Sequence, residues 1–392
     1  MNFSHYAIVT DGVWRKSLSA IRSLGKAGFH VIVMGDSLFT TGFWSRYTQN
    51  RIIAPVASVE LMGFGNSMLD TLRGFNEECI PVLFPMEDAS LMWVARNIES
   101  VRKYAHILIP PLESLEIAQD KSRTIQIAEE IGIPYPRTWK FSKLSDFLDT
   151  VYKLQGISFV VKPRISSGSA GVIYGNPFTP EQWKKHWEHY GRLIIQERIP
   201  SEGHGLGVGL LMDNNNECVA QFAYERLHEY PITGGPSTDR KSIYNAVLVE
   251  QSIKLLKRLN WKGVAMVEWK LDINTGIHKL IEINPRFWGS LELSIRAGVN
   301  FPVLYAKTAI GEKVEPVLDY KENIRCRWMV PGDILRFLNQ PKEEREKLRD
   351  FLKGLPSSTE EWDKTDIRGS IASVICPALL VLNPRYWKYL RR

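Results

Sequence analysis

The first hundred residues alternate short apolar runs with a segment of helical spacing. Apolar runs at Tyr6–Thr10, Phe29–Met34 and around Val82 predict strands, and Ser17–Ala27 repeats Leu and Ile along one helix face. Strands separated by helices favour a parallel sheet with right-handed crossovers. The turn after the first strand reads TDGVWRKS and lacks GxGxxG. The topology is therefore expected to be Rossmann-like, without a dinucleotide-binding site.

A different pattern begins after a linker expected at Ile109–Leu112. Asp120 is placed to N-cap a helix that runs to about Ile131, with Gly132 as its stop. Helical spacing returns over 247–259. Short apolar runs predict further strands at Phe159–Lys162, Leu193–Gln196, Val208–Met212 and Val219–Tyr224.

The strongest chemical signal is a predicted hairpin formed by VAMVEWKLD and IHKLIEIN, joined by a three-residue NTG loop. If Ile273 pairs with Ile277, Glu268 lies directly opposite Glu282. Residues two apart share one face of a strand, so Asn284 joins the two carboxylates.

Carboxylates facing each other in this way repel, because their Cβ atoms lie about 4.5–5.5 Å apart. A hard divalent cation with oxygen ligands would offset the repulsion, and Mg²⁺ suits two carboxylates, an amide and substrate phosphates. The alternative is that the carboxylates face water or pair with Lys270 and Lys279. A slip of one residue would place them on opposite faces.

Two lysines occupy positions from which they could contact phosphate groups. Lys162 ends an apolar strand and precedes the Gly/Ser-rich RISSGSAG, whose backbone N–H groups are suited to folding over phosphate oxygens. Lys121 opens a helix, where a cation opposes the helix dipole unless an anion lies near. The alternative for the Gly/Ser-rich segment is an ordinary surface turn. The alternative for Lys121 is pairing with Asp120.

Composition narrows the classes of protein. At roughly 100–200 residues per domain, 392 residues correspond to two or three domains. The net charge of +7 favours an anionic ligand only weakly, and no nucleic-acid partner is expected. The four cysteines form no CxxC pair, which disfavours a zinc site or disulfides and fits a reducing compartment. Motifs of serine hydrolases, zinc proteases, kinases and Walker A NTPases are absent.

No apolar run approaches the ~18 residues that span a bilayer, and no signal peptide is evident. A cytoplasmic location is therefore expected. The segment ALLVLNPRYWKYLRR is apolar and then basic and aromatic. We expect it to pack on its own domain, with contact to an anionic membrane surface as the alternative.

Several motifs occur in an order that resembles the ATP-grasp superfamily. They are DKSRTIQIAEEIGIPYPRT, FVVKPRISSGSAGV, LIIQERIP, VEWKLD and IEINPRFWGS. The chain looks most similar to the branch related to carbamoyl-phosphate synthase and to amino-acid (carboxylate–amine) ligases. The resemblance covers roughly residues 1–315.

This resemblance implies a fold of class α/β and α+β. A Rossmann-like pre-ATP-grasp domain would occupy 1–110, and a two-lobed ATP-grasp domain 111–315. Its small lobe would span about 118–196 and its large lobe about 197–315. A small, mostly helical C-terminal region would follow at 316–392, with charged helices expected at 332–338 and 341–352.

By matching positions, the resemblance implies that Lys121 and Lys162 contact ATP phosphates. The loop that would close over the phosphates contributes Ser167, Gly168, Ser169 and Gly171.

The hinge between the lobes would be Gln196–Ile199, meeting adenine through backbone groups of Gln196 and Ile199, with Glu197 near the adenine amino group. Glu202 or His204 would reach the ribose, although GHGLGVG departs from the family patterns.

Glu268, Glu282 and Asn284 would hold magnesium, expected as two ions, with Mn²⁺ as a substitute. Arg286, and with it Arg226, would steady the transferring phosphoryl group or a substrate carboxylate.

The implied activity is an ADP-forming ligase that activates a carboxylate as an acylphosphate and joins it to an amine. The substrates would be small and amino-acid-like, and a homodimer is left open. Two alternatives stay open as well. One is an ATP-binding regulatory or partner-binding protein without turnover, and the other is a carboxylase of the same fold that uses bicarbonate.

Overall fold

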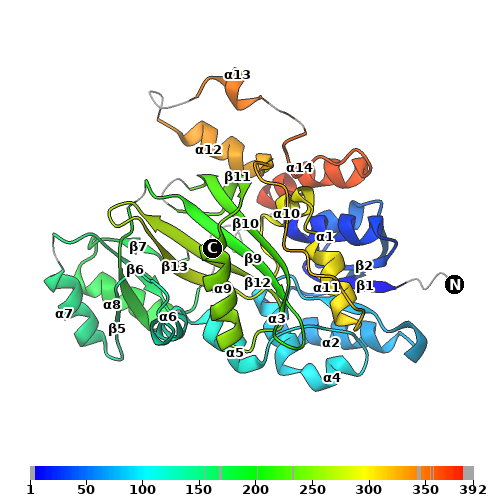
Figure 1. Cartoon of the computed structure of the whole chain (residues 1–392), viewed down its shortest axis with the longest axis horizontal. Coiled ribbons are helices and arrows are strands. Elements are labelled where there is room, and N and C mark those ends of the chain that lie inside the picture. Colours follow the sequence, from blue (N-terminus) through cyan, green and yellow to red (C-terminus); the bar gives the residue numbers. More distant parts are fainter. Residues whose placement is uncertain are drawn as a thin grey trace.

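The computed structural model describes residues 5–154, 156–166, 170–200, 202–231, 234–341, 346–353, 355 and 357–382. Three β-sheets lie side by side with helices around them (Figure 1). The mixed α/β and α+β class expected from the sequence is confirmed. Among the described residues, no helix is long and apolar enough to cross a membrane.

The first sheet is parallel, with strand order β3-β2-β1-β4, as expected from the alternating pattern. Its strands are β1 (Tyr6–Val9), β2 (His30–Gly35), β3 (Thr48–Ile53) and β4 (Val82–Phe84). Its helices are α1 (Arg15–Lys26), the 3₁₀ turn η1 (Thr41–Trp44), α2 (Leu61–Arg73), the 3₁₀ turn η2 (Glu77–Cys79), α3 (Asp88–Arg96) and α4 (Ile98–Arg102). Sequence patterns missed β3 because Thr48–Ile53 carries polar residues on an edge strand.

Helices α5 (Leu112–Gln119) and α6 (Lys121–Glu130) lead into the second sheet. The Asp120 side chain accepts from the N–H groups of Ser122 and Arg123, so the predicted N-cap is confirmed. Gly132 follows with φ +71°, a conformation that glycine adopts without strain.

The second sheet is antiparallel, with order β5-β8-β6-β7. It comprises β5 (Thr138–Lys140), β6 (Phe159–Pro163), β7 (Ile173–Tyr174) and β8 (Leu193–Glu197). One face packs on α7 (Leu144–Lys153) and α8 (Pro180–Tyr190) around Phe147, Phe159 and Trp183. Figure 1 shows this lobe at the left, leaving the other face of the sheet turned toward the rest of the molecule.

The third sheet has six strands in the order β13-β12-β9-β10-β11-β14. Its strands are β9 (Gly205–Met212), β10 (Cys218–Glu229), β11 (Ser237–Ile243), β12 (Gly263–Asp272), β13 (Ile277–Asn284) and β14 (Arg325–Arg327). The helices that pack with it are α9 (Ala246–Arg258), α10 (Leu291–Ala297) and α11 (Phe301–Ala309).

The hairpin of β12 and β13 forms where predicted, but its turn differs. Asp272 pairs with Ile277, so four residues form the loop and the expected pairing of Ile273 with Ile277 is wrong. Ile281 is an extra residue on β13, and this bulge shifts the register back. Beyond the bulge, Glu268 lies opposite Glu282, as predicted.

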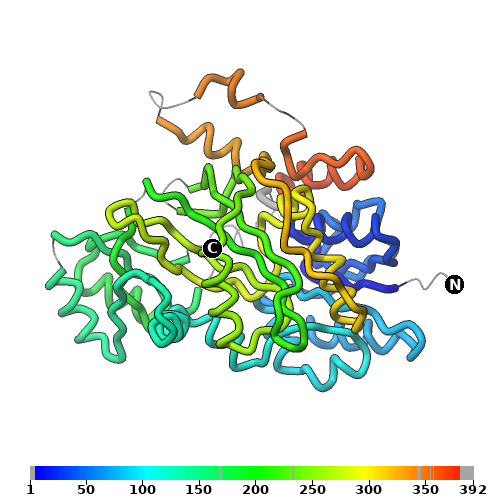
Figure 2. The backbone as a smooth tube through the Cα atoms, in the orientation of Figure 1, coloured from blue at the N-terminus to red at the C-terminus, as the bar shows by residue number. Residues whose placement is uncertain are grey.

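The C-terminal region crosses back over the first sheet. It contains a short π-helical turn η3 (Met329–Asp333) and the helices α12 (Ile334–Asn339), α13 (Leu348–Phe351) and α14 (Ile367–Leu382). The helix expected over 341–352 is wrong in extent, because the regular helix occupies only Leu348–Phe351 of the described residues there. Figure 2 shows the red segment that contains α14 lying beside the blue N-terminal part of the chain.

Candidate active site

The hairpin brings two carboxylates and an amide together. The Asn284 Nδ2 donates to Glu268 Oε1 at 3.1 Å and reaches Glu282 Oε1 at 3.4 Å. Met266, opposite Asn284, continues the face of Glu268, whereas Ile283 and Val267 enter a hydrophobic core on the other face. The predicted convergence of Glu268, Glu282 and Asn284 is therefore present.

Two cations of the chain offset the negative charge. Arg226 on β10 places its Nη2 2.6 Å from Glu268 Oε1, and the Lys121 Nζ lies 3.5 Å from Glu282 Oε2. Burial raises the pKa of Glu268, and the nearby Arg226 charge acts in the opposite direction. Burial is also the largest influence on Arg226, but the adjacent Glu268 holds its pKa well above the usual value.

Lys162 faces this hairpin from the second sheet. Its Nζ donates to Gln196 Oε1 at 2.9 Å, and the Gln196 Nε2 donates to the Thr138 hydroxyl at 3.0 Å. Burial lowers the pKa of Lys162 to about 8, while Glu282 favours the charged form and Lys121 opposes it. Lys121 and Lys162 thus act electrostatically on one another across the space beside Glu282.

Lys270 belongs to this site, although the sequence analysis named it only as a possible partner of the paired carboxylates. It lies two residues after Glu268 on a regular stretch of β12, so both side chains share one face. Burial lowers the pKa of Lys270, and Lys270 in turn lowers that of Lys162. Neither lysine of the alternative interpretation neutralises the paired carboxylates: Lys279 pairs with Glu197 and Asp272. The strand alternation itself was the signal that pointed to Lys270.

The segment expected to be the hinge joins the second and third sheets. The Glu197 N–H donates to the Arg137 carbonyl at 2.9 Å, and the Arg198 N–H donates to the Ser158 carbonyl at 3.2 Å. These two donors are already used, and the Glu197 carboxylate pairs with Lys279. Ile199 is buried just beyond them.

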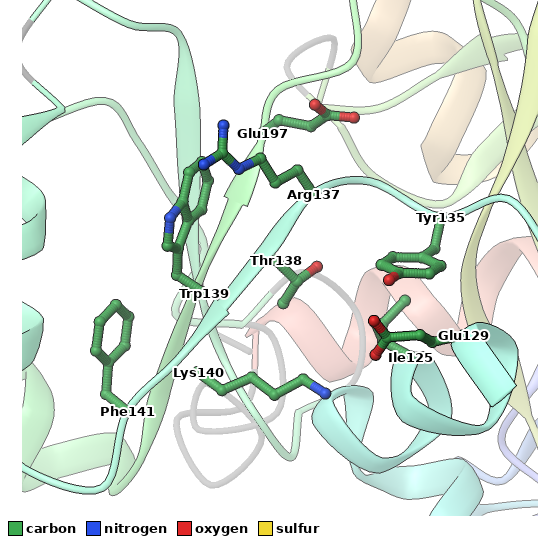
Figure 3. Close-up of a pocket in the computed structure, with 9 residues that line it drawn as sticks. All are labelled: Ile125, Glu129, Tyr135, Arg137, Thr138, Trp139, Lys140, Phe141 and Glu197. Atoms are coloured by element: carbon green, nitrogen blue, oxygen red, sulfur yellow. The ribbon is translucent and has the colours of Figure 1, made fainter.

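An open cavity of about 670 Å³ borders this hinge. Figure 3 shows Ile125, Glu129 and Tyr135 from the end of α6 and the segment after it, opposite Thr138 and Lys140 of β5, with Glu197 above. Since Thr138 also accepts from Gln196, the cavity adjoins the face of the sheet that carries Lys162.

Glu202 and His204 lie on the connection into β9. The His204 Nδ1 lies 3.8 Å from Glu225 Oε1, and Glu202 is close enough to Lys270 to raise the pKa of that lysine. Between them, Gly203 passes so close to β12 that a Cβ would lie 1.8 Å from the Leu271 carbonyl oxygen. This close approach explains why position 203 is a glycine. The ribose contact expected of Glu202 or His204 stays a prediction.

The predicted phosphate loop is described only in part. Ser167, Gly168 and Ser169 lie outside the described residues. Ser166, before them, accepts from the Lys121 Nζ through its carbonyl at 2.8 Å. Gly171, after them, has φ +72°, and its carbonyl lies 3.0 Å from the His186 Nε2.

Arg286, just after β13, turns toward the first sheet. Its Nε lies 3.1 Å from Asp88 Oδ1 and 3.8 Å from Glu87 Oε2. Lys16 in α1 lies 2.6 Å from Glu87 Oε1 and donates to the Phe287 carbonyl at 3.1 Å. These charges join the carboxyl edge of the first sheet to the third sheet, and sequence spacing could not reveal them because they are far apart in the chain.

The residues present fit a magnesium ion in their chemistry. Two carboxylates and an amide oxygen are hard oxygen donors, provided that Asn284 turns its Oδ1 toward the ion. Within the described part of the chain, no group of three or more His, Cys, Asp or Glu side chains forms a metal site. The four cysteines are all free.

Comparison with known proteins places these motifs in context. A family model described as ATP-grasp in the biosynthetic pathway with Ter operon matches residues 233–330. The chain is 24% identical over 227 residues to the carbamoyl phosphate synthase large chain of Methanocorpusculum labreanum, covering 54% of this chain and 21% of the relative. Identity to the large chain of Thermoplasma volcanium is 23% over 341 residues, covering 79% and 31%. The chain therefore spans about a fifth to a third of these curated relatives.

Solved structures share the fold. Biotin carboxylase from Campylobacter jejuni, in a β-γ-ATP complex, has a TM-score of 0.64 at 16% identity, covering 82% of this chain and 74% of that one. N5-carboxyaminoimidazole synthetase from Staphylococcus aureus, complexed with ADP, has a TM-score of 0.62 at 16% identity, covering 83% and 81%. The comparisons thus give an ATP-grasp match over residues 233–330 and homology to carbamoyl phosphate synthase large chains, and the fold of the chain is that of these solved structures.

Proposed function

We propose that this protein is an ATP-dependent, ADP-forming ligase that joins a small carboxylate to an amine. The observation that carries the proposal is the convergence of Glu268, Glu282 and Asn284 with Lys121 and Lys162 between two sheets. A hard-oxygen cluster facing buried lysines suits a magnesium-bound triphosphate. Structural neighbours in complex with β-γ-ATP, with ADP and with the magnesium salt of ADP support the same ligand.

In this proposal each group has a defined part. Lys121, Lys162 and Lys270 hold phosphate oxygens, and adenine lies against the hinge at Gln196–Ile199. Glu268, Glu282 and Asn284 hold one or two Mg²⁺ ions, or Mn²⁺. Bound there, the metal would neutralise phosphate oxygens as charge shifts during transfer.

The proposed reaction has two steps. A carboxylate oxygen attacks the γ-phosphorus of ATP, the bond to the ADP oxygen breaks, and an acylphosphate forms. An amine then attacks the acyl carbon and releases phosphate. Phosphoryl transfer requires positioning and neutralisation of spread negative charge, which lysines and Arg226 or Arg286 supply without a Ser or Cys nucleophile.

A carboxylase that activates bicarbonate is the second candidate. It is favoured by the structural neighbours biotin carboxylase and N5-carboxyaminoimidazole synthetase. The biotin carboxylase domain of the 2-oxoglutarate carboxylase from Hydrogenobacter thermophilus, solved with bicarbonate, favours it as well. The two candidates share the nucleotide site and differ in the group that receives the phosphoryl group.

ADP release across a panel of amino-acid pairs, with and without bicarbonate, tests both. Acceptor-dependent ADP release supports the ligase, and bicarbonate-dependent release supports the carboxylase. ATP binding with neither response would instead identify a binding protein without turnover.

Glu282→Ala tests the site directly. We expect turnover to fall by about a hundredfold or more, because a carboxylate that would hold the magnesium ion beside the transferring phosphate is lost. Glu217→Ala is the matched control, since Glu217 is an exposed carboxylate of the same lobe that pairs with Lys257. Circular dichroism checks that both variants fold, and wild-type turnover in Glu282→Ala would exclude Glu282 from the site.

A further inference from the structure

Helix α14 (Ile367–Leu382) is oriented with its large apolar residues outward. The exposed fractions are 46% for Ile367, 53% for Ile371, 41% for Val374, 49% for Ile375 and 38% for Leu379. These positions follow the spacing of a single helix face. We call these five residues the outer stripe.

The opposite face of α14 is built from small side chains. Among the described side chains of α14, the buried residues are Gly369, Ser370, Ala372 and Cys376. A helix that docks only on its own domain normally turns its large aliphatic side chains inward. The reversed arrangement of α14 therefore indicates an apolar environment on the outer side.

Hydrogen bonds to Asp366, the residue before α14, fix the start of the helix. Asp366, fully buried, accepts from the Arg22 Nε at 2.9 Å, the Ser45 hydroxyl at 2.9 Å and the Arg46 N–H at 2.8 Å. The Gly369 N–H also donates to the Asp366 carboxylate, at 3.2 Å. Because these bonds secure the start of the helix, the outer stripe is presented by a folded element.

Exposed aromatic residues lie on and next to η1, which α14 contacts, and a basic residue of β3 lies beside them. Helix α14 packs against η1, and the segment around η1 exposes Leu38 (61%), Phe39 (40%) and Trp44 (42%). Arg51 stacks over the Trp44 ring at 5.3 Å. An apolar surface with aromatic and arginine side chains beside it suits the boundary between lipid chains and headgroups.

The sequence that follows α14 has the charge of a lipid-binding segment. Residues 383–392 read NPRYWKYLRR, with four basic residues, three aromatic residues and no acidic residue. Two copies of the chain would carry the same basic residues, which repel one another. An anionic lipid surface would attract them instead.

We propose that the outer stripe of α14, with Trp44 and Arg51 beside it, binds the surface of an anionic phospholipid membrane. The helix lies in the interface and does not cross the bilayer, in keeping with its length. This contact uses none of the residues placed in the nucleotide site, so it stands independently of the proposed ligase activity.

Flotation of the full chain with phosphatidylcholine vesicles, with and without phosphatidylserine, tests the proposal. We expect binding only to vesicles that contain phosphatidylserine, and weaker binding at high salt because the attraction is partly electrostatic. The double variant Ile371→Glu with Ile375→Glu should reduce binding by about tenfold or more, because it removes the apolar contact.

The matched control is Met62→Glu with Val247→Glu. These residues are 74% and 60% exposed on α2 and α9, so the control makes the same change of charge outside the outer stripe. It should retain vesicle binding. The proposal is overturned if wild-type protein binds neither vesicle, or if both double variants lose binding equally. It is also overturned if the outer-stripe variant merely converts a dimer to a monomer, since the stripe would then join two copies.

Discussion

At the scale of single residues, the site is organised by pairs of opposite charge. Glu268 meets Arg226, and Glu282 meets Lys121, so the repulsion between the two facing carboxylates is offset by the chain itself. The repulsion is therefore offset in part without a metal ion. Support for magnesium comes instead from the hard-oxygen donor set and from the lysines that face it.

Lys162 gives a pH-dependent prediction. Its pKa of about 8 means that the ammonium is mostly charged near neutral pH and mostly neutral at about one pH unit above that value. We therefore expect ATP affinity to fall, by up to about tenfold, as pH rises from about 7 to about 9. Isothermal titration calorimetry over that range measures the loss.

The Lys162→Arg variant serves as the comparison, because arginine keeps its charge throughout this range. Its affinity should depend less on pH than that of the wild type. An affinity of the wild-type protein that stays constant across the range would remove Lys162 from the phosphate site.

At the scale of elements, the hairpin shows how a local irregularity preserves a functional face. The turn pairs Asp272 with Ile277, one residue away from the register that aligns Glu268 with Glu282. The bulge at Ile281 compensates for this difference. The predicted pairing of the carboxylates was right, although the turn from which it was derived was wrong.

Gly276 in this turn gives a stability prediction. Its φ is +69°, and no atom lies within 4 Å of an added Cβ, so Gly276→Ala tests backbone conformation without a clash. We expect the free energy of unfolding to fall by about 1 kcal/mol, measured by urea denaturation.

Two further variants serve as comparisons for Gly276→Ala. Gly276→Asn should cost less, since asparagine tolerates the left-handed conformation better than alanine. Gly74→Ala, at φ −72°, should change stability little. Equal losses from Gly276→Ala and Gly276→Asn would mean that the conformation of the turn does not limit stability.

At the scale of the whole molecule, the C-terminal region ties distant parts together. Glu360 pairs with Arg15 of α1 and with Arg240 of β11, and Asp366 pairs with Arg22. Arg15 also stacks over Trp328, with 4.3 Å to the ring centre. The first sheet, the third sheet and α14 therefore share one buried network of charges.

Removal of Asp366 should release this network. We expect Asp366→Ala to lower the free energy of unfolding by roughly 3–5 kcal/mol, because Arg22 is left buried without its partner. Urea denaturation measures the loss, and limited proteolysis after Arg368 should accelerate. Lys364→Ala, at an exposed neighbour, should leave both unchanged. A loss below about 1 kcal/mol would show that Asp366 does not anchor the region.

The sequence by itself determined the local features of this protein. Apolar periodicity identified three of the four parallel strands, Asp120 marked its helix start, and strand alternation on either side of the NTG turn identified the hairpin that carries Glu268 and Glu282. These features depend on residues within a few positions of one another, where backbone geometry leaves few choices. The boundaries of the expected domains, and the roles of the site residues, stay predictions.

The tertiary structure alone decided which charges meet across the molecule. Arg226 reaches Glu268, Arg286 reaches Asp88, and Lys121 reaches Glu282. It alone also showed that α14 turns its aliphatic residues outward. Contacts between residues far apart in the chain depend on how sheets and helices pack. Packing leaves no local pattern in a single sequence from which such contacts could be predicted.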